Sequence, residues 1–251
     1  MKRTELHEAA ANGRLLQLGN LIHQGSNVNA VDEYHFTPLH DAVINRKSAC
    51  AKVLLKASAN PNARDICNRT PLYFACCRVS LKCCELLLDN GAVVSNTIFQ
   101  TAINCGCKSI VQLLVQSGAK VTTSCLSAAC WSDISIMKTL LLSSQDAEEF
   151  VNRALHVAVQ SNKPDHVKLL LEFGANPFHK NDDGQNSKEI TLTNSECFKL
   201  LDIAQGAPHK LLELCRIWMM RYFRSINKDI SCVNELPLPH PIAQYLMYNT
   251  D

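Results

Sequence analysis

Short apolar runs of three residues recur along most of the chain at regular distances. Successive runs start 33, 33, 27, 27 and 29 residues apart, at Asn20, Val53, Leu86, Leu113, Leu140 and Leu169. Five residues after most starts comes a glycine, which readily adopts the left-handed conformation that ends a helix. Ser58 and Gln145 take that place in two units, where we expect local strain or a changed turn. A weaker unit ends at Leu200-Leu201. The pattern predicts a series of repeated helices.

A second motif opens each unit. Thr37-Pro38-Leu39-His40 recurs 33 residues later as Thr70-Pro71-Leu72-Tyr73, with degenerate copies at Thr4–His7 and Arg153–His156. Threonine caps a helix, and proline suits the first helical position. A small residue and a second apolar helix follow, which predicts a helix pair in each unit. Since His7, His40 and His156 share one repeat position, we expect them to bond the backbone rather than to form a catalytic site.

A 33-residue period with Thr-Pro-Leu-His-x-Ala resembles the ankyrin repeat. The resemblance covers residues 1–205, as six units and a worn seventh. It implies an all-α solenoid of antiparallel helix pairs with hairpin fingers along one edge. The physical reason agrees, because no unit of this length can bury its apolar face alone and neighbouring units must stack.

Units four and five are six residues short, and the loss lies between the helix-ending turn and the next helix. We therefore expect stunted fingers around residues 95–100 and 122–126, and full fingers near 32–36 and 65–69. Finger tips and inner helices are where a protein substrate would bind. The candidate substrate-binding residues on the fingers are Tyr34, His35, Phe36, Cys67, Asn68 and Arg69, with Ile44, Asn45 and Arg46 on an inner helix. The alternative is that these are solvated turn residues, but Tyr34 and Phe36 are more aromatic than a turn requires.

The stretch 211–223, LLELCRIWMMRYF, predicts an amphipathic helix. One face carries Leu211, Cys215, Trp218, Met219 and Tyr222 at helical spacing. Thirteen residues after it comes Leu236-Pro237-Leu238-Pro239, whose two prolines exclude a helix interior or central strand. This helix could cap the solenoid as its last element. A cap needs a polar outer face, however, and this helix is too apolar, which favours a docking surface.

Residues 208–248 resemble a SOCS box, through Leu211-x-x-Leu214-Cys215-Arg216, Met219, Leu-Pro-Leu-Pro and Ile242-x-x-Tyr245-Leu246-x-Tyr248. Lys210 and Met220 depart from the usual pattern. Ankyrin repeats at 1–205 followed by a SOCS box at 206–251 resemble the ankyrin repeat and SOCS box family. The resemblance implies elongin C binding by Leu211, Leu214, Cys215, Trp218 and Met219, and cullin-5 binding by Leu236, Pro237, Leu238 and Pro239.

This resemblance implies a substrate-recognition adaptor of an elongin B/C–cullin-5–RING ubiquitin ligase, which promotes ubiquitination and proteasomal degradation of a bound protein. The chain itself would not be an enzyme. One alternative is an ankyrin scaffold whose C-terminal helix only caps the solenoid. A weaker one is a cysteine-dependent enzyme, which would need a reactive thiol of low pKa.

The composition bears on the kind of partner and on the location of the protein. The chain is 47% hydrophobic and 19% charged, as in a globular protein, and its net charge of +2 predicts neither nucleic acid nor a membrane as partner. No apolar run approaches the roughly 18 residues of a membrane span, and the N-terminus lacks the apolar core of a secretory signal. We therefore expect a protein of the cytoplasm or nucleus.

Thirteen cysteines are many, but none forms paired Cys-x-x-Cys motifs with zinc spacing. We expect them to be reduced thiols that pack as small apolar residues. The sequence has no glycine-rich phosphate loop and no His-Glu-x-x-His motif. It therefore predicts no catalytic residue, metal site or cofactor.

Overall fold

The computed structural model describes residues 3–143, 147–193 and 195–206, so the predicted SOCS box lies outside the described residues. The chain falls into two compact units, Met1–Thr139 and Leu140–Asp251. The helices, in chain order, are α1 Glu5–Asn12, α2 Leu15–His23, α3 Pro38–Ile44, α4 Ser48–Lys56, α5 Pro71–Cys77, α6 Leu81–Asp89, α7 Asn96–Asn104, α8 Lys108–Gln116, α9 Thr123–Ala129, α10 Ile134–Ser143, α11 Ala147–Gln160, α12 Pro164–Glu172 and α13 Glu196–Gly206.

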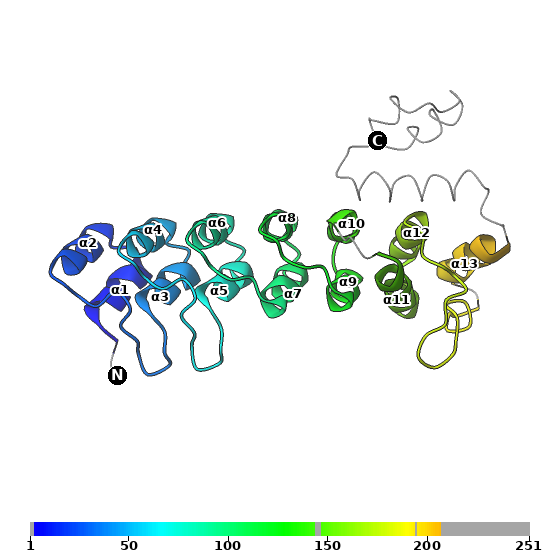
Figure 1. Ribbon diagram of the computed structural model, residues 1–251, viewed down its shortest axis with the longest axis horizontal. Helices are drawn as coiled ribbons and strands as arrows, with labels where there is room; N and C mark the ends of the chain where they lie inside the picture. The colour runs from blue at the N-terminus through cyan, green and yellow to red at the C-terminus, as the bar shows by residue number, and fades with distance from the viewer. Residues whose placement is uncertain (1–2, 144–146, 194, 207–251) are drawn as a thin grey trace, which may run out of the picture. The chain divides into compact units, whose positions relative to one another are not determined.

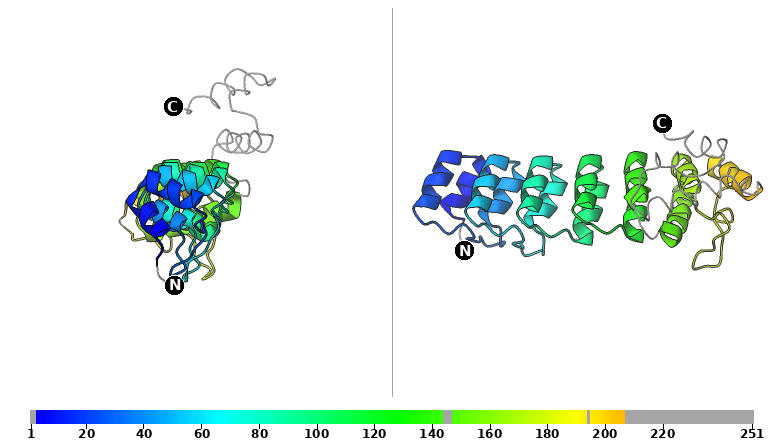
Figure 2. Two further views of the ribbon diagram at one scale, coloured as in Figure 1. Left: turned by 90° about the vertical axis from the view of Figure 1, so that its left-hand side faces the viewer. Right: turned by 45° about the horizontal axis from the view of Figure 1, so that its top comes forward.

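The N-terminal unit is a stack of helix pairs in two rows. Helices α1, α3, α5, α7 and α9 pack side by side in an inner row, and α2, α4, α6 and α8 form an outer row, which is the upper row in Figure 1. Two long loops, before α3 and before α5, project from the inner row as fingers. The expected all-α solenoid of ankyrin type is confirmed. The same arrangement of rows and fingers can be followed from two further directions in Figure 2.

Each inner helix begins at the cap that the repeated motif predicts. Thr37 lies at the N-cap of α3, Pro38 fills its first position, and the Thr37 hydroxyl accepts a hydrogen bond from the His40 N–H at 3.4 Å. The small residues that follow the motif are fully buried where successive inner helices meet, at Ala9, Ala42, Ala75, Ala102 and Ala129. An alanine there lets the helix backbones approach closely, so the stack forms one continuous core.

The turns after the outer helices use the left-handed conformation that the spacing indicates. Gly25, Gly91 and Gly118 have φ of 84°, 82° and 87°. Ser58 replaces glycine and still adopts φ 65°, so the expected strain at this position is confirmed. Gln145 lies outside the described residues.

The expectation of stunted fingers at 95–100 and 122–126 is wrong. Ser95 is the N-cap of α7 and Thr122 the N-cap of α9, so these segments are first turns of inner helices. The loss of six residues removes the whole finger, and the outer helix runs through a short turn straight into the next cap. The degenerate motif at Arg153 also differs from expectation, because it lies inside α11, which begins at Ala147.

The second unit pairs α11 with α12 and packs α12 against α13. Between α12 and α13 lies a long connection, in which Lys180 and Asn186 make an antiparallel bridge. Pro164 at the first position of α12 starts that helix.

Seven of the eleven cysteines in the described residues are buried, as expected of thiols that act as small apolar side chains; the buried ones are Cys50, Cys76, Cys83, Cys84, Cys125, Cys130 and Cys197. Within the described residues, the helices are too short or too polar to span a lipid bilayer.

Candidate protein-binding surface

The two fingers of the N-terminal unit repeat one hydrogen-bond pattern 33 residues apart. Oδ1 of Asp32 accepts the backbone N–H groups of Tyr34 and Phe36, each at 2.9 Å. Oδ1 of Asp65 does the same for Cys67 at 3.0 Å and Arg69 at 2.8 Å. Both aspartates are buried, so each carboxylate replaces water for backbone donors that a tight loop cannot pair otherwise.

The second finger carries an additional ion pair. Nη2 and Nε of Arg69 lie 2.7 and 2.8 Å from Oδ2 of Asp65. Burial by itself would raise the pKa of Asp65, but the hydrogen bonds from Arg69 outweigh it and hold this pKa below its usual value. The carboxylate therefore stays ionised and keeps the tip of the second finger in place.

The fingers touch each other at their tips. The N–H of Ile66 donates to the carbonyl oxygen of Tyr34 at 3.1 Å. Ile66 is 58% exposed and Tyr34 is 52% exposed. Together they make an apolar patch that the two finger tips share. Tyr34 is among the sequence-predicted residues, whereas Ile66 was missed. The signal was present, since an isoleucine next to Asp65 stands where the first finger has Glu33.

The predicted finger residues divide into two groups. Tyr34, His35 and Asn68 are exposed at the tips, and His35 and Asn68 adopt φ of 60° and 63°. Phe36 and Arg69 lie at the finger bases and are partly buried. They pack on α5, where the Arg69 guanidinium lies 4.9 Å from the Phe74 ring centre and the Phe36 ring 5.6 Å from it. These two residues therefore support the fingers as well as lining their surface.

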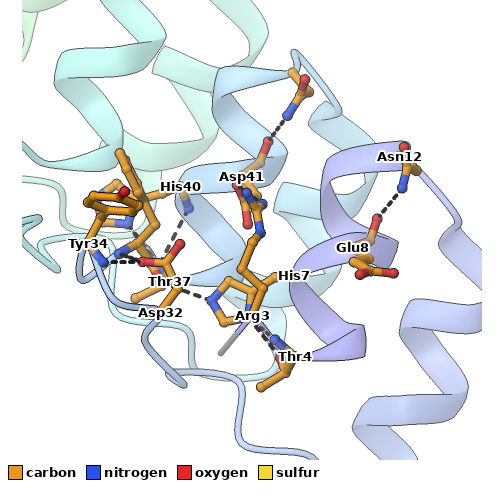
Figure 3. Close-up of polar contacts among 12 residues, drawn as sticks. Arg3, Thr4, His7, Glu8, Asn12, Asp32, Tyr34, Thr37, His40 and Asp41 are labelled. Carbon is orange, nitrogen blue, oxygen red and sulfur yellow. Dashed lines mark hydrogen bonds and ion pairs between the residues drawn. The ribbon is translucent and has the colours of Figure 1, made fainter. Parts of the chain in front are cut away.

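A histidine of the preceding repeat binds the base of each of these two fingers, and Figure 3 labels the two histidines, His7 and His40. Nε2 of His7 lies 2.9 Å from the carbonyl oxygen of Phe36, and Nε2 of His40 lies 3.4 Å from that of Arg69. His156 also binds a backbone carbonyl in the second unit, with Nε2 3.0 Å from the oxygen of His179, although His179 lies two residues before Asn181 and does not end a finger as Phe36 and Arg69 do. We call His7, His40 and His156 the finger-binding histidines. The predicted structural role of these side chains is confirmed.

The same position changes where the next repeat has no finger. Tyr73 replaces the histidine in α5, and the connection after α6 is the short segment 90–95. Ile98 replaces it in α7, and the connection after α8 is the short segment 117–122. Without a finger there is no carbonyl for the ring to bind. The departure from histidine in the motif is thus explained by the missing fingers.

The second unit carries a finger that the sequence interpretation missed. Oδ1 of Asn181 accepts the N–H groups of Asp183 and Gln185 at 3.1 and 2.9 Å, as Asp32 and Asp65 do in the first two fingers. Gly184 takes the left-handed position with φ 77°. The sequence Asn-Asp-Asp-Gly is a strong turn signal. It lies in a degenerate part of the repeat pattern, however, and no Thr-Pro-Leu-His motif follows it.

At the N-terminal end of the stack, Arg3 crosses to α3. Its Nη2 lies 2.6 Å from Oδ1 of the buried Asp41, a contact drawn in Figure 3. Burial raises the pKa of Asp41 although the charge of Arg3 opposes the shift. Of the predicted inner-helix residues, Ile44 ends α3 and Asn45 caps it, and Arg46 turns toward the third repeat, where its guanidinium donates to the carbonyl of Arg78.

Several of the described cysteines have a thiol pKa that burial raises, which is opposite to what a nucleophile needs. Burial raises the pKa of Cys130 to about 12 and also raises that of Cys83 and Cys105. Such thiols stay protonated at neutral pH. Within the part of the chain that the structure describes, histidine, cysteine and acidic side chains do not gather in threes as a metal site would require.

The predicted elongin C-binding residues and the Leu236–Pro239 segment lie outside the described residues, so their expected roles remain predictions.

Comparison with known proteins identifies the repeats and the family. Models of the ankyrin repeat match residues 1–33, 21–75, 59–125 and 99–183. Ankyrin repeat and SOCS box protein 11 of Pongo abelii is 41% identical over 261 residues, which covers 98% of this chain and 80% of that protein. The chain belongs to the ankyrin repeat and SOCS box family. Ankyrin repeat and SOCS box protein 5 of Oryctolagus cuniculus is 43% identical over 98% of this chain and 78% of its own length.

Solved structures of ankyrin repeat domains resemble this chain, and one of them is from the ankyrin repeat and SOCS box family. The ankyrin repeat domain of human ASB11 superimposes with a TM-score of 0.70 at 31% identity, over 82% of this chain and all of that domain. The ankyrin repeat domain of Bcl-3 gives 0.70 at 25% identity. The alignment with the Pongo abelii relative spans 261 residues against 251 here, so at least ten residues of that relative have no counterpart.

Proposed function

We propose that this chain is the substrate-recognition adaptor of a ubiquitin ligase built on elongin B/C, cullin-5 and a RING partner. Its ankyrin repeats bind a protein, its SOCS box binds elongin C and cullin-5, and the bound protein is ubiquitinated and degraded. The chain contributes proximity and orientation, and its partners carry out the transfer chemistry.

One observation supports the proposal most. This chain, which belongs to the family and has a predicted SOCS box, also presents an exposed apolar patch that does not contribute to its core. Tyr34 and Ile66 are more than half exposed at the two finger tips. Exposed aromatic and aliphatic groups on rigid supports are the usual anchors of protein interfaces. The aspartate hydrogen bonds and the finger-binding histidines supply that rigidity, which lowers the entropy lost on binding.

Co-expression with elongin B and elongin C tests the proposal against the scaffold alternative. We expect a stoichiometric complex that survives size-exclusion chromatography and then recruits cullin-5. The control is a chain that ends at residue 207, after the last residue of α13, which keeps every described helix. An adaptor loses elongin in this control, whereas a full-length chain that fails to bind elongin is a scaffold.

A further inference from the structure

Most of the exposed apolar side chains of the N-terminal unit lie at one place in the repeat. Among its described residues, nine large hydrophobic side chains are exposed. Three belong to the connections on the finger side, at Tyr34, Ile66 and Val93. The other six lie where an inner helix turns into its outer helix, at Leu15, Leu16, Val79, Leu81, Trp131 and Ile134. We call these five turns, residues 12–16, 45–49, 78–82, 105–109 and 130–134, the turn edge.

The repeat fold does not require apolar residues at these positions. Leu15, Leu81 and Ile134 are the first residues of α2, α6 and α10. The equivalent first residues of α4 and α8 are Ser48 and Lys108, and those helices form equally well. Leu16 is 87% and Trp131 70% exposed, so neither side chain contributes much to the core. A requirement other than folding therefore accounts for the apolar character of the turn edge.

Positive charge gathers at the same edge. The five turns contain one acidic residue, Asp133, and six basic ones, Arg14, Arg46, Lys47, Arg78, Lys82 and Lys108, all of them exposed. The connections on the finger side, residues 24–37, 57–70, 90–95 and 117–122, contain three basic and three acidic residues. The net charge of +2 for the whole chain hides this asymmetry. The expectation that no membrane is bound rested on that net charge, whereas binding depends on the local field.

We propose that the turn edge binds an anionic membrane surface. Arginine and lysine would contact lipid phosphates and carboxylates, and the leucines and Trp131 would enter the headgroup region, where tryptophan is favoured. The groups lie on five successive turns instead of in one concavity, so a broad planar partner can meet them all. A peptide bound in a groove could not. Inner helices begin at the finger side and end at the turn edge, so a membrane-bound chain keeps its finger tips free.

Sedimentation of the full chain with vesicles tests this assignment. The probes are vesicles of phosphatidylcholine alone and of phosphatidylcholine mixed with phosphatidylserine, at low and high salt. We expect binding only to the mixed vesicles. Arg14→Gln, Lys82→Gln and Lys108→Gln together should weaken it by roughly a hundredfold, since each charge contributes about fivefold. Arg46 and Lys47 are left in place, because Arg46 bonds to Arg78 and Lys47 packs on Gly13.

The matched control removes the same charge from the finger side. Lys56 at the end of α4, and Arg64 and Lys120 in the connections, are exposed on this side, and their replacement by Gln should leave vesicle binding unchanged. A second variant, Leu16→Ser with Trp131→Ser, should weaken binding at both salt concentrations without lowering the melting temperature.

Three outcomes overturn the proposal. The first is that the unaltered chain does not sediment with the anionic vesicles. The second is that the control triple variant loses as much binding as the turn-edge variant, which would mean a general charge effect. The third is that the chain binds soluble polyglutamate through the turn edge and ignores vesicles, which would assign this edge to an acidic protein. None of these outcomes depends on elongin binding, so the proposed adaptor function stands or falls separately.

Discussion

Nε2 of His40 lies 3.4 Å from the carbonyl oxygen of Arg69, the last finger residue before the next repeat. A carbonyl only accepts, so Nε2 carries the proton. Nδ1 is then free to accept from the Thr37 N–H at 3.2 Å and the Thr37 hydroxyl at 2.9 Å. The neutral tautomer is thus specified from both sides, and one side chain joins the cap of its own helix to the finger of its neighbour.

Acid should weaken this connection. Burial lowers the pKa of His40 to about 4, while Asp65 and Asp32 partly oppose the shift. In the unfolded chain the pKa is about 6.5, so between these values the unfolded state binds a proton that the folded state resists. The contribution to stability is therefore complete above pH 6.5 and is lost progressively toward pH 4, up to about 3 kcal/mol. Urea unfolding at pH 7 and pH 5 measures the loss.

His40→Gln is the control for the acid effect. This variant should be less stable at pH 7, and its unfolding free energy should fall less between pH 7 and pH 5. The pKa of His156 is also lowered by burial, so part of the pH dependence should remain. An unaltered pH dependence in His40→Gln would contradict the assignment to His40.

Two threonines at the same repeat position should respond oppositely to the same substitution. The hydroxyl of Thr37 bonds to His40, but the hydroxyl of Thr70 is buried without a partner among the described residues, because Tyr73 replaces the histidine. Thr37→Val should destabilise the protein by about 1–2 kcal/mol. Thr70→Val removes an unsatisfied polar group and should be neutral or stabilising. Equal losses for the two variants in urea unfolding would contradict this account.

Replacing Val79 by glycine should stabilise the folded protein. Val79 adopts φ 51°, where its branched side chain is strained, and it is 43% exposed, so little burial is lost. We expect Val79→Gly to raise the free energy of unfolding by up to about 1 kcal/mol. The control is Val93→Gly, since Val93 is 66% exposed and is not among the residues of positive φ. That change should destabilise the protein, as measured by thermal unfolding.

The finger tips can be tested without disturbing the fold. Tyr34→Ala with Ile66→Ala removes the patch that the two tips share, whereas changes to Phe36 or Arg69 would also weaken the finger bases. If the proposed function is correct, proximity labelling under proteasome inhibition should recover at least about tenfold less of the bound protein, and elongin binding should be unchanged. Val93→Ala serves as an exposed control. Normal recovery by the double variant would exclude the tips as the binding site.

The two halves of the predicted SOCS box should be separable. Leu211→Ala with Cys215→Ala removes two predicted elongin C anchors, and truncation of a buried leucine typically costs about 2–5 kcal/mol. Elongin and cullin-5 should both be lost in pull-downs. Replacing Leu236-Pro237-Leu238-Pro239 by alanines should keep elongin B/C and lose cullin-5. If this second variant recruits the cullin normally, the Leu-Pro-Leu-Pro segment is only a loop.

The sequence by itself determined the repeat architecture, because the relevant interactions are local and periodic. A threonine cap, a proline at the first helical position and a small residue in phase specify each inner helix from a few neighbouring residues. Period and phase then specify the stack, since each repeat contacts the next one in the same way. The structural role of the repeated histidines followed from the same regularity.

Only the tertiary structure decided what happens where the repeat is broken. A deletion can shorten a finger or remove it. Which of the two happens depends on whether the turn after the outer helix can connect directly to the N-cap of the next inner helix, as the chain does between Gly91 and Ser95. The contact between Ile66 and Tyr34 joins two fingers, and the third finger at Asn181 follows a worn motif. These features arise from distances between segments that the sequence does not specify locally, and so does the gathering of basic and apolar residues from five separate turns on one edge.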